Sequence, residues 1–364
     1  MDEAALHELM SGKRRDLDAI LIRSVLSIAA VGYASAMWWR NLAYDGGWLP
    51  THHVSVPVIS LGNITTGGTG KTPFAAWLAN WLLSNHCRPG LLSRGYRSLG
   101  PENRSSSVVS GNDEKLVLDR LCPTIPHIQQ RDRVGSARQL IDEFDCNVLI
   151  LDDGFQHRRL RRDLDLVLID AMQPWGFNHV LPRGLLREQK SALRRADLVL
   201  ITRANLCGAD ELKKLRSELF TIRSNEECVE LAFAPQRLIN LDGQIDDLKQ
   251  IREKRCLAFC GIGNPMSFRK TAESFGDVVQ FQSFPDHYHY KTDDLDSLAA
   301  EAKQLRVDIV LTTLKDLVKV HPDDWHGPPL AAVDIGLEFL CGREILESRL
   351  QKIIGLAVPP SKTD

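Results

Sequence analysis

Residues 65–72 read Thr-Thr-Gly-Gly-Thr-Gly-Lys-Thr, a pattern whose chemistry is the binding of nucleotide phosphates. The backbone N–H groups of such a loop point inward at phosphate oxygens, and the following helix adds its positive N-terminal end. We expect Lys71 to reach the β- and γ-phosphates and the Thr72 hydroxyl to bind Mg²⁺. ATP and Mg²⁺ are the expected cofactors. The expected ATP-binding residues are Thr65, Thr66, Gly67, Gly68, Thr69, Gly70, Lys71 and Thr72.

The loop departs from the usual pattern at its first position, where this chain has Thr65 in place of glycine. The alternative interpretation is a glycine-rich turn followed by a chance Gly-Lys-Thr. Spacing and context favour the phosphate loop, because an apolar strand is predicted at 56–62 and a helix at 71–83. Pro73 falls in the first turn of that helix, where its missing N–H costs little.

Asp152 and Asp153 end a strongly apolar predicted strand at 147–153. A carboxylate at such a position can hold Mg²⁺ or its bound water. The alternative is an ordinary turn at the end of a strand, since an Asp-Gly pair favours turns. The neighbouring phosphate loop favours the functional interpretation.

Two further patches carry groups suited to proton transfer. Asp113 and Glu114 open a predicted helix, and His287 lies in Phe-Pro-Asp-His-Tyr after a strand of the second half. An acid and a histidine brought together act as a base and its orienting partner toward a hydroxyl. The alternatives are a charge pair at a helix N-terminus and a histidine without a catalytic role. Nothing in the sequence brings the two patches together, so both interpretations stay open at this point.

Arginines cluster after His157 and again after Pro182. Such clusters suit phosphate groups, and a solvated charged face is an equal alternative for the first run. Nucleic acid is not favoured, because the run has no interleaved aromatic residues and the net charge is -2. The arginines are Arg158, Arg159, Arg161 and Arg162 in the first group and Arg183 and Arg187 in the second.

The elements that must position these groups follow an alternating pattern of apolar strands and amphipathic helices. Further strands are expected at 90–95, 164–170 and 197–202, and a further helix at 131–144. Continuous apolar strands indicate a parallel sheet covered on both faces. After a polar stretch at 223–227 the pattern restarts, with strands at 256–261, 277–284 and 307–313 and helices at 265–275 and 292–306.

Length and composition agree with two globular α/β domains. The chain has 364 residues, of which 43% are hydrophobic and 25% charged. Its eight cysteines form no CxxC pair, so we interpret them as reduced thiols, with Cys256 and Cys260 packed in the core and not bound to metal. The expected segments are an N-terminal helix at 1–45, the P-loop domain at 46–225 and a smaller C-terminal domain at 226–364.

The N-terminal segment is apolar over residues 20–39 apart from Arg23. The uncharged stretch, residues 24–39, is shorter than the roughly 20 residues of a spanning helix. Basic residues precede it and a Trp-Trp pair ends it, which favours a helix lying in a membrane surface. A helix packed on the protein's own core is one alternative. A signal peptide with a cleavage site at Ala-Ser-Ala is another, but the acidic start and the ATP site argue against export.

Together these motifs resemble the tetraacyldisaccharide 4'-kinases, the lipid A 4'-kinases of Gram-negative bacteria. The resemblance covers most of the chain, and DDGFQH with its arginine tail is its most specific part. The motifs, in chain order, are TTGGTGKTP, SRGYR (93–97), NDE (112–114), LDDGFQHRRLRRDLDLVLID (151–170), PRGLLRE (182–188), GIGNP (261–265) and FPDHY (284–288).

The resemblance implies two P-loop-like α/β/α domains joined by a short β linker, with ATP bound between them and an N-terminal membrane-associated helix. It implies phosphorylation of the 4'-hydroxyl of a tetraacyldisaccharide 1-phosphate by ATP, giving lipid IVA. It also implies the cytoplasmic face of the inner membrane as the location. We expect no nucleic acid and no obligate protein partner. The main alternative is a P-loop switch ATPase or GTPase acting on a protein partner.

The resemblance also implies roles for individual residues. Asp113 activates the hydroxyl with His287 as its partner, and Glu114 helps to hold Mg²⁺ and ATP. Lys71 neutralises charge on the transferred phosphate. The remaining assignments are Asp152 and Asp153 toward Mg²⁺ or the substrate, and either Arg187 or Arg183 toward a phosphate. The chain has Lys115 where family members usually carry proline, which loosens a turn and removes no catalytic group.

Overall fold

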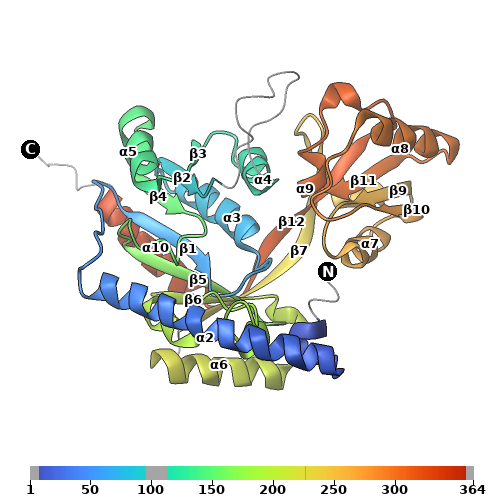
Figure 1. The fold of residues 1–364 in the computed structure, drawn as a ribbon. Helices are drawn as coiled ribbons and strands as arrows, with labels where there is room; N and C mark the ends of the chain where they lie inside the picture. The colour runs from blue at the N-terminus through green and yellow to red at the C-terminus, as the bar shows by residue number, and fades with distance from the viewer. Residues whose placement is uncertain (1–7, 96–112, 226, 358–364) are drawn as a thin grey trace, which may run out of the picture. The chain divides into compact units, whose positions relative to one another are not determined.

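The computed structural model describes residues 8–95, 113–225 and 227–357 (Figure 1). Two compact units make up the chain, and each is discontinuous in sequence. One unit comprises residues 1–94, 125–232 and 338–364, and the other comprises 95–124 and 233–337. We call them unit one and unit two. The contiguous limits expected from sequence, 46–225 and 226–364, stay a prediction. Tyr96, Arg97 and Asn112, which belong to two of the quoted motifs, lie outside the described residues.

Unit one is built on a parallel sheet in the order β7-β6-β5-β1-β4-β2-β3. Burial is complete along β1, β2, β4, β5 and β6, as expected for strands covered on both faces. The strands are β1 (Val58–Asn63), β2 (Pro89–Ser93), β3 (His127–Gln129), β4 (Val148–Leu151), β5 (Leu164–Asp170), β6 (Leu198–Thr202) and the start of β7 (Cys228–Asn240).

Helices of unit one pack on this sheet through apolar side chains. Leu215 and Leu219 of α6 join a buried cluster with Val167 and Val199 of the sheet. Leu140 of α5 joins a second cluster around β2 and β4. The helices of this sheet layer are α3 (Lys71–Ser84), α5 (Arg133–Phe144), α6 (Ala209–Arg223) and α10 (Arg343–Ala357).

Unit two repeats the pattern on a smaller scale. Its parallel strands run in the order β10-β9-β11-β12, and β8 (Ile245–Asp247) pairs antiparallel with the end of β7. Both β7 and β12 have residues in each unit, so the chain passes between the units through extended strands. The other elements are β9 (Arg255–Cys260), β10 (Asp277–Ser283), β11 (Ile309–Thr313), β12 (Leu330–Cys341), α4 (Asp113–Leu121), α7 (Pro265–Glu273), α8 (Thr292–Gln304) and α9 (Leu314–Leu317).

The N-terminal helix α2 (Leu17–Asp45) extends beyond the apolar stretch at 20–39 in both directions and belongs to unit one (Figure 1). Polar groups on one side attach it there: Tyr33 Oη donates to the carbonyl of Arg187 at 2.8 Å, and Arg40 donates to the carbonyl of Gln156 at 2.7 Å. Its apolar residues are mostly exposed, and 6% of its most apolar 18-residue window is buried, so it is not a core helix. By length and composition alone, it is long enough to cross a membrane.

Candidate functional site

The phosphate loop connects the end of β1 to the start of α3. Gly67 and Gly70 have φ values of 118° and 81°, which a residue with a side chain adopts only with strain. Asn63, the last residue of β1, donates a side-chain hydrogen bond to Thr69 Oγ1 at 3.2 Å, and both residues are buried. The N–H of Thr66 donates to the carbonyl of Leu185 at 2.7 Å. Strand and neighbouring loop thus fix a backbone conformation that only glycine tolerates at two positions.

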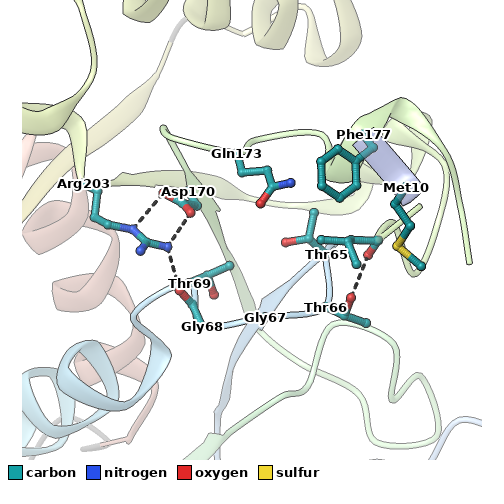
Figure 2. Close-up of a pocket in the computed structure, with 11 residues that line it drawn as sticks. Met10, Thr65, Thr66, Gly67, Gly68, Thr69, Asp170, Gln173, Phe177 and Arg203 are labelled. Carbon is teal, nitrogen blue, oxygen red and sulfur yellow. Dashed lines mark hydrogen bonds and ion pairs between the residues drawn. The ribbon is translucent and has the colours of Figure 1, made fainter. Parts of the chain in front are cut away.

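Beside the loop lies a cavity of about 340 Å³ (Figure 2). Arg203 joins the cavity wall to the loop: Nε donates to Asp170 Oδ1 at 2.8 Å, and Nη2 donates to the carbonyl of Gly68 at 2.8 Å. Asp170 ends β5 and Arg203 follows β6. Because these neighbouring strands are parallel, both residues lie at the carboxyl ends of the strands. This pair was not predicted from the sequence, although Asp170 ends one predicted strand and Arg203 directly follows another.

Lys71 and Arg187 converge on Asp153. Lys71 Nζ lies 3.5 Å from Asp153 Oδ1, and Arg187 Nη1 donates to both oxygens of that carboxylate at 2.7 and 2.9 Å. Burial on its own raises the pKa of Asp153, but Lys71, Arg187 and Arg133 together hold this pKa below its usual value. Asp152, the preceding residue, is buried at the end of β4, which pairs with β1. Asp152 and Asp153 therefore lie at the carboxyl ends of the parallel strands, on the same side of the sheet as the phosphate loop.

The two arginines that the sequence could not separate lie in different places. Arg187 contacts Asp153 beside Lys71, whereas Arg183 Nη1 donates to the carbonyl of Met10 at 2.8 Å. Burial lowers the pKa of Arg183, and Arg23 adds to that effect. Of this pair, Arg187 therefore lies with Lys71 and Asp153, whereas Arg183 contacts Met10, which lines the cavity beside the loop.

The arginine run after His157 is partly structural. Arg162 donates to Asp165 Oδ2 at 3.0 Å and to the carbonyl of His157 at 3.1 Å, and Arg158 donates to Asp45 at 2.6 Å. Burial lowers the pKa of His157 to about 4, with a smaller contribution from surrounding arginines. This imidazole is accordingly neutral at pH 7, and at least these two arginines stabilise the unit itself.

Unit two holds the second group of predicted residues. Asp113 begins α4, and its Oδ2 accepts a hydrogen bond from His287 Nδ1 at 2.9 Å. Lys319 Nζ lies 3.0 Å from the same oxygen. Burial favours a higher pKa for Asp113, but the His287 hydrogen bond and Lys319 outweigh it and keep the pKa below its usual value. Asp113 and His287 are therefore in contact, which the sequence alone could not show, and Lys319, which was not predicted, lies beside the same carboxylate.

The expected metal ligands are divided between the units. Thr72 and Asp152 belong to unit one, and Glu114 is an exposed residue of unit two. Among the described residues, no group of three His, Cys, Asp or Glu side chains is placed to hold a metal ion. Thr72 and Asp152 supply hard oxygen donors, which fit Mg²⁺ because this ion keeps several waters and uses substrate phosphates as ligands.

Cys256 and Cys260 behave as packed thiols. Both are buried in one apolar cluster of unit two. Burial raises the pKa of each of these two thiols to about 11. Both are therefore protonated at neutral pH and pack as small apolar groups, as the sequence predicted.

Comparison with known proteins gives consistent matches along the chain. The family model for tetraacyldisaccharide-1-P 4'-kinase (LpxK) matches residues 22–355. The tetraacyldisaccharide 4'-kinase of Syntrophus aciditrophicus is 38% identical over 342 residues, covering 89% of this chain and 91% of the relative. The protein of the same name from Halothermothrix orenii is 35% identical, with 89% of each chain covered. Crystalline LpxK from Aquifex aeolicus in complex with ATP is 29% identical, with a TM-score of 0.74 over 91% of this chain and 99% of that one.

Proposed function

The chain belongs to the tetraacyldisaccharide 4'-kinase family, and from that premise we propose how its two units divide the work of a kinase that acts on a lipid A precursor. Unit one binds ATP through residues 65–72, and unit two supplies Asp113 to the acceptor hydroxyl. The reaction transfers the γ-phosphate of ATP to the 4'-hydroxyl of a tetraacyldisaccharide 1-phosphate, forming lipid IVA. The alternative of a P-loop switch ATPase is not favoured, because the relatives named above are all tetraacyldisaccharide 4'-kinases.

Phosphoryl transfer requires positioning and charge neutralisation more than covalent chemistry from the protein. The N–H groups of the loop and the N-terminal end of α3 hold the phosphate oxygens, and Lys71 balances charge on the γ-phosphate. Thr72 and Asp152 are the unit-one groups that would hold Mg²⁺, with Glu114 assigned by resemblance. When bound, Mg²⁺ neutralises part of the phosphate charge.

Asp113 accepts the proton of the acceptor hydroxyl as the new P–O bond forms. The bond from the γ-phosphorus to the bridging oxygen breaks, and ADP leaves with the bridging electrons. His287 holds Asp113 through the 2.9 Å hydrogen bond, and this contact is the observation that supports the assignment best. A carboxylate with a lowered pKa is ionised at neutral pH and ready to accept the proton. Arg187 is the arginine we assign to a phosphate, with Asp153 beside it toward the substrate.

We also propose that α2 lies on the cytoplasmic surface of the inner membrane. Its attachments to unit one at Tyr33, Arg40 and Asn41 hold it along the body of the protein. The opposite side presents Val25, Ile28 and Val31, whose side chains are 66%, 75% and 68% exposed. An acceptor whose acyl chains stay in the bilayer then meets the kinase at the membrane surface.

The test is transfer of label from γ-labelled ATP to a tetraacyldisaccharide 1-phosphate in mixed micelles, with Lys71→Ala as control. We expect label in the lipid with the wild-type chain and none with Lys71→Ala. Product analysis then locates the phosphate at the 4'-position. A wild-type chain that binds ATP and labels no lipid would refute the proposal and return attention to the switch-ATPase alternative.

A further inference from the structure

Lys319 is a cation buried inside unit two. Its side chain is 6% exposed, and it follows the short helix α9. Burial of an ammonium group costs several kcal/mol unless an anion compensates the charge. Two carboxylates lie beside Lys319 Nζ, with Asp113 Oδ2 at 3.0 Å and Asp316 Oδ1 at 3.5 Å. A group this expensive to bury, placed against a carboxylate of the candidate site, points to a role at that carboxylate.

Asp316 is held by hydrogen bonds from its surroundings. It is 0% exposed, and its Oδ2 accepts hydrogen bonds from the N–H of Gly261 at 3.0 Å and from Thr313 Oγ1 at 2.6 Å. A Cβ added to Gly261 would lie 3.2 Å from Asp316 Oδ1, so the backbone approaches this carboxylate closely. Tyr290 lies at the same place, 3.1 Å from that Cβ position. The surrounding backbone thus holds Asp316, and Lys319 Nζ pairs with its Oδ1 by charge, without a hydrogen bond between them.

Gly261 connects the same centre to His287. Its carbonyl accepts a hydrogen bond from the backbone N–H of His287 at 3.2 Å, while its own N–H donates to Asp316. His287 has a φ of 57°, a strained value for a residue with a side chain, and its N–H also lies 3.0 Å from Asp286 Oδ1. Two series of contacts therefore connect Asp316 to Asp113. One passes through Lys319, and the other passes through Gly261 and His287.

Both series of contacts end at Oδ2 of Asp113. His287 Nδ1 and Lys319 Nζ lie 2.9 and 3.0 Å from Oδ2, and no hydrogen bond or ion pair from the described residues reaches Oδ1. We infer that Lys319, ion-paired with Asp316, is a positioning residue that fixes Asp113 through Oδ2 and leaves Oδ1 to accept the hydrogen bond of the acceptor hydroxyl. The inference rests on the proposed role of Asp113 as the base.

The experiment compares Lys319→Met with Lys315→Met, a matched control on α9. For Lys319→Met we expect kcat to fall about 10-fold or more and the KM for ATP to stay unchanged. Lys315→Met is expected to match the wild-type chain. Lys319→Met leaves Asp316 without its cation, so Lys319→Met/Asp316→Asn, which removes both charges, is measured beside it. Circular dichroism checks that each variant folds.

A double variant separates positioning from a general loss of structure. If Lys319 acts through Asp113, adding Lys319→Met to Asp113→Asn lowers kcat no further. An equal loss in both backgrounds, or a folded charge-free double variant with wild-type kcat, would overturn the inference while leaving Asp113 as the base. Wild-type kcat in Asp113→Asn alone would instead refute the base assignment and, with it, the inference.

Discussion

His287 Nδ1 lies 2.9 Å from Asp113 Oδ2, although 174 positions separate the two residues along the chain. Asp113 is mostly buried, with 13% of its side chain exposed, whereas His287 is 65% exposed. A shielded carboxylate held by an accessible imidazole suits a base whose free oxygen must meet a hydroxyl of a large acceptor. This pair is the point at which the proposed chemistry is most directly testable.

Replacing Asp113 by Asn keeps the shape of the side chain and removes the base. We expect kcat to fall by about 10²- to 10⁴-fold, the usual contribution of general acid–base catalysis, while the Kd for ATP stays within about two-fold. Single-turnover transfer to the lipid and ATP titration measure the two quantities separately. A collapse of ATP affinity with little further change in turnover would place Asp113 in the nucleotide site instead.

Replacing His287 by Ala changes the pH at which Asp113 ionises. The His287 hydrogen bond lowers the pKa of Asp113, so its loss raises that pKa. Activity requires the ionised carboxylate and is lost as pH falls through this pKa, so the acid limb moves to higher pH, by about one unit. The profile of kcat against pH checks this, with exposed His289→Ala as control. An acid limb that stays in place would show that His287 does not act through Asp113.

The sequence predicted unit one well because its strands are buried on both faces. Leu164–Asp170 forms β5 over the full predicted range, since a parallel sheet covered by helices requires a continuous apolar strand. By contrast, β7 and β12 went unpredicted. Each strand has residues in both units, and their burial changes along their length, so neither shows a simple apolar pattern. No element was assigned to α10, a helix with few fully buried residues.

The candidate site divides in the same way between local and distant relationships. The phosphate loop is contiguous, so its glycine spacing is visible in the sequence, and β1 and α3 flank it as expected. The pairing of Asp113 with His287 depends on tertiary packing, because Val117 of α4 shares an apolar cluster with Phe284 and Tyr290 on either side of His287, and no local pattern shows this. Lys319 was missed because it belongs to no motif; its signal was a pair of charges, Asp316 and Lys319, among apolar neighbours.

The exposed face of α2 is expected to bind the membrane. Val25→Asp, Ile28→Asp and Val31→Asp, combined in one chain, place charges on that face, where an interfacial helix buries apolar side chains. We expect the variant to move from the membrane fraction to the soluble fraction in flotation with anionic vesicles, with an unchanged melting temperature. Ile245→Asp, at an apolar residue of unit two that is 57% exposed, is the control. Equal vesicle binding by both proteins would remove the assignment of this face.

Arg187 and Arg183 are expected to differ in their effect on transfer. Arg187 donates two hydrogen bonds to Asp153 beside Lys71, whereas Arg183 donates to the carbonyl of Met10 near the start of the N-terminal segment. Arg187→Ala should therefore lower kcat/KM by about 10²-fold or more, an effect of roughly 2.7 kcal/mol in transition-state stabilisation. It also leaves Asp153 with Lys71 and Arg133 as its neighbouring cations, so the fold is expected to persist.

Arg183→Ala should loosen the N-terminal segment, which limited proteolysis detects, and reduce transfer by less than about three-fold. The kinetics of lipid phosphorylation by both variants test this assignment. A greater loss of transfer in Arg183→Ala than in Arg187→Ala would assign the phosphate contact to Arg183, because Arg183 does not contact Asp153 and its replacement leaves that carboxylate in place.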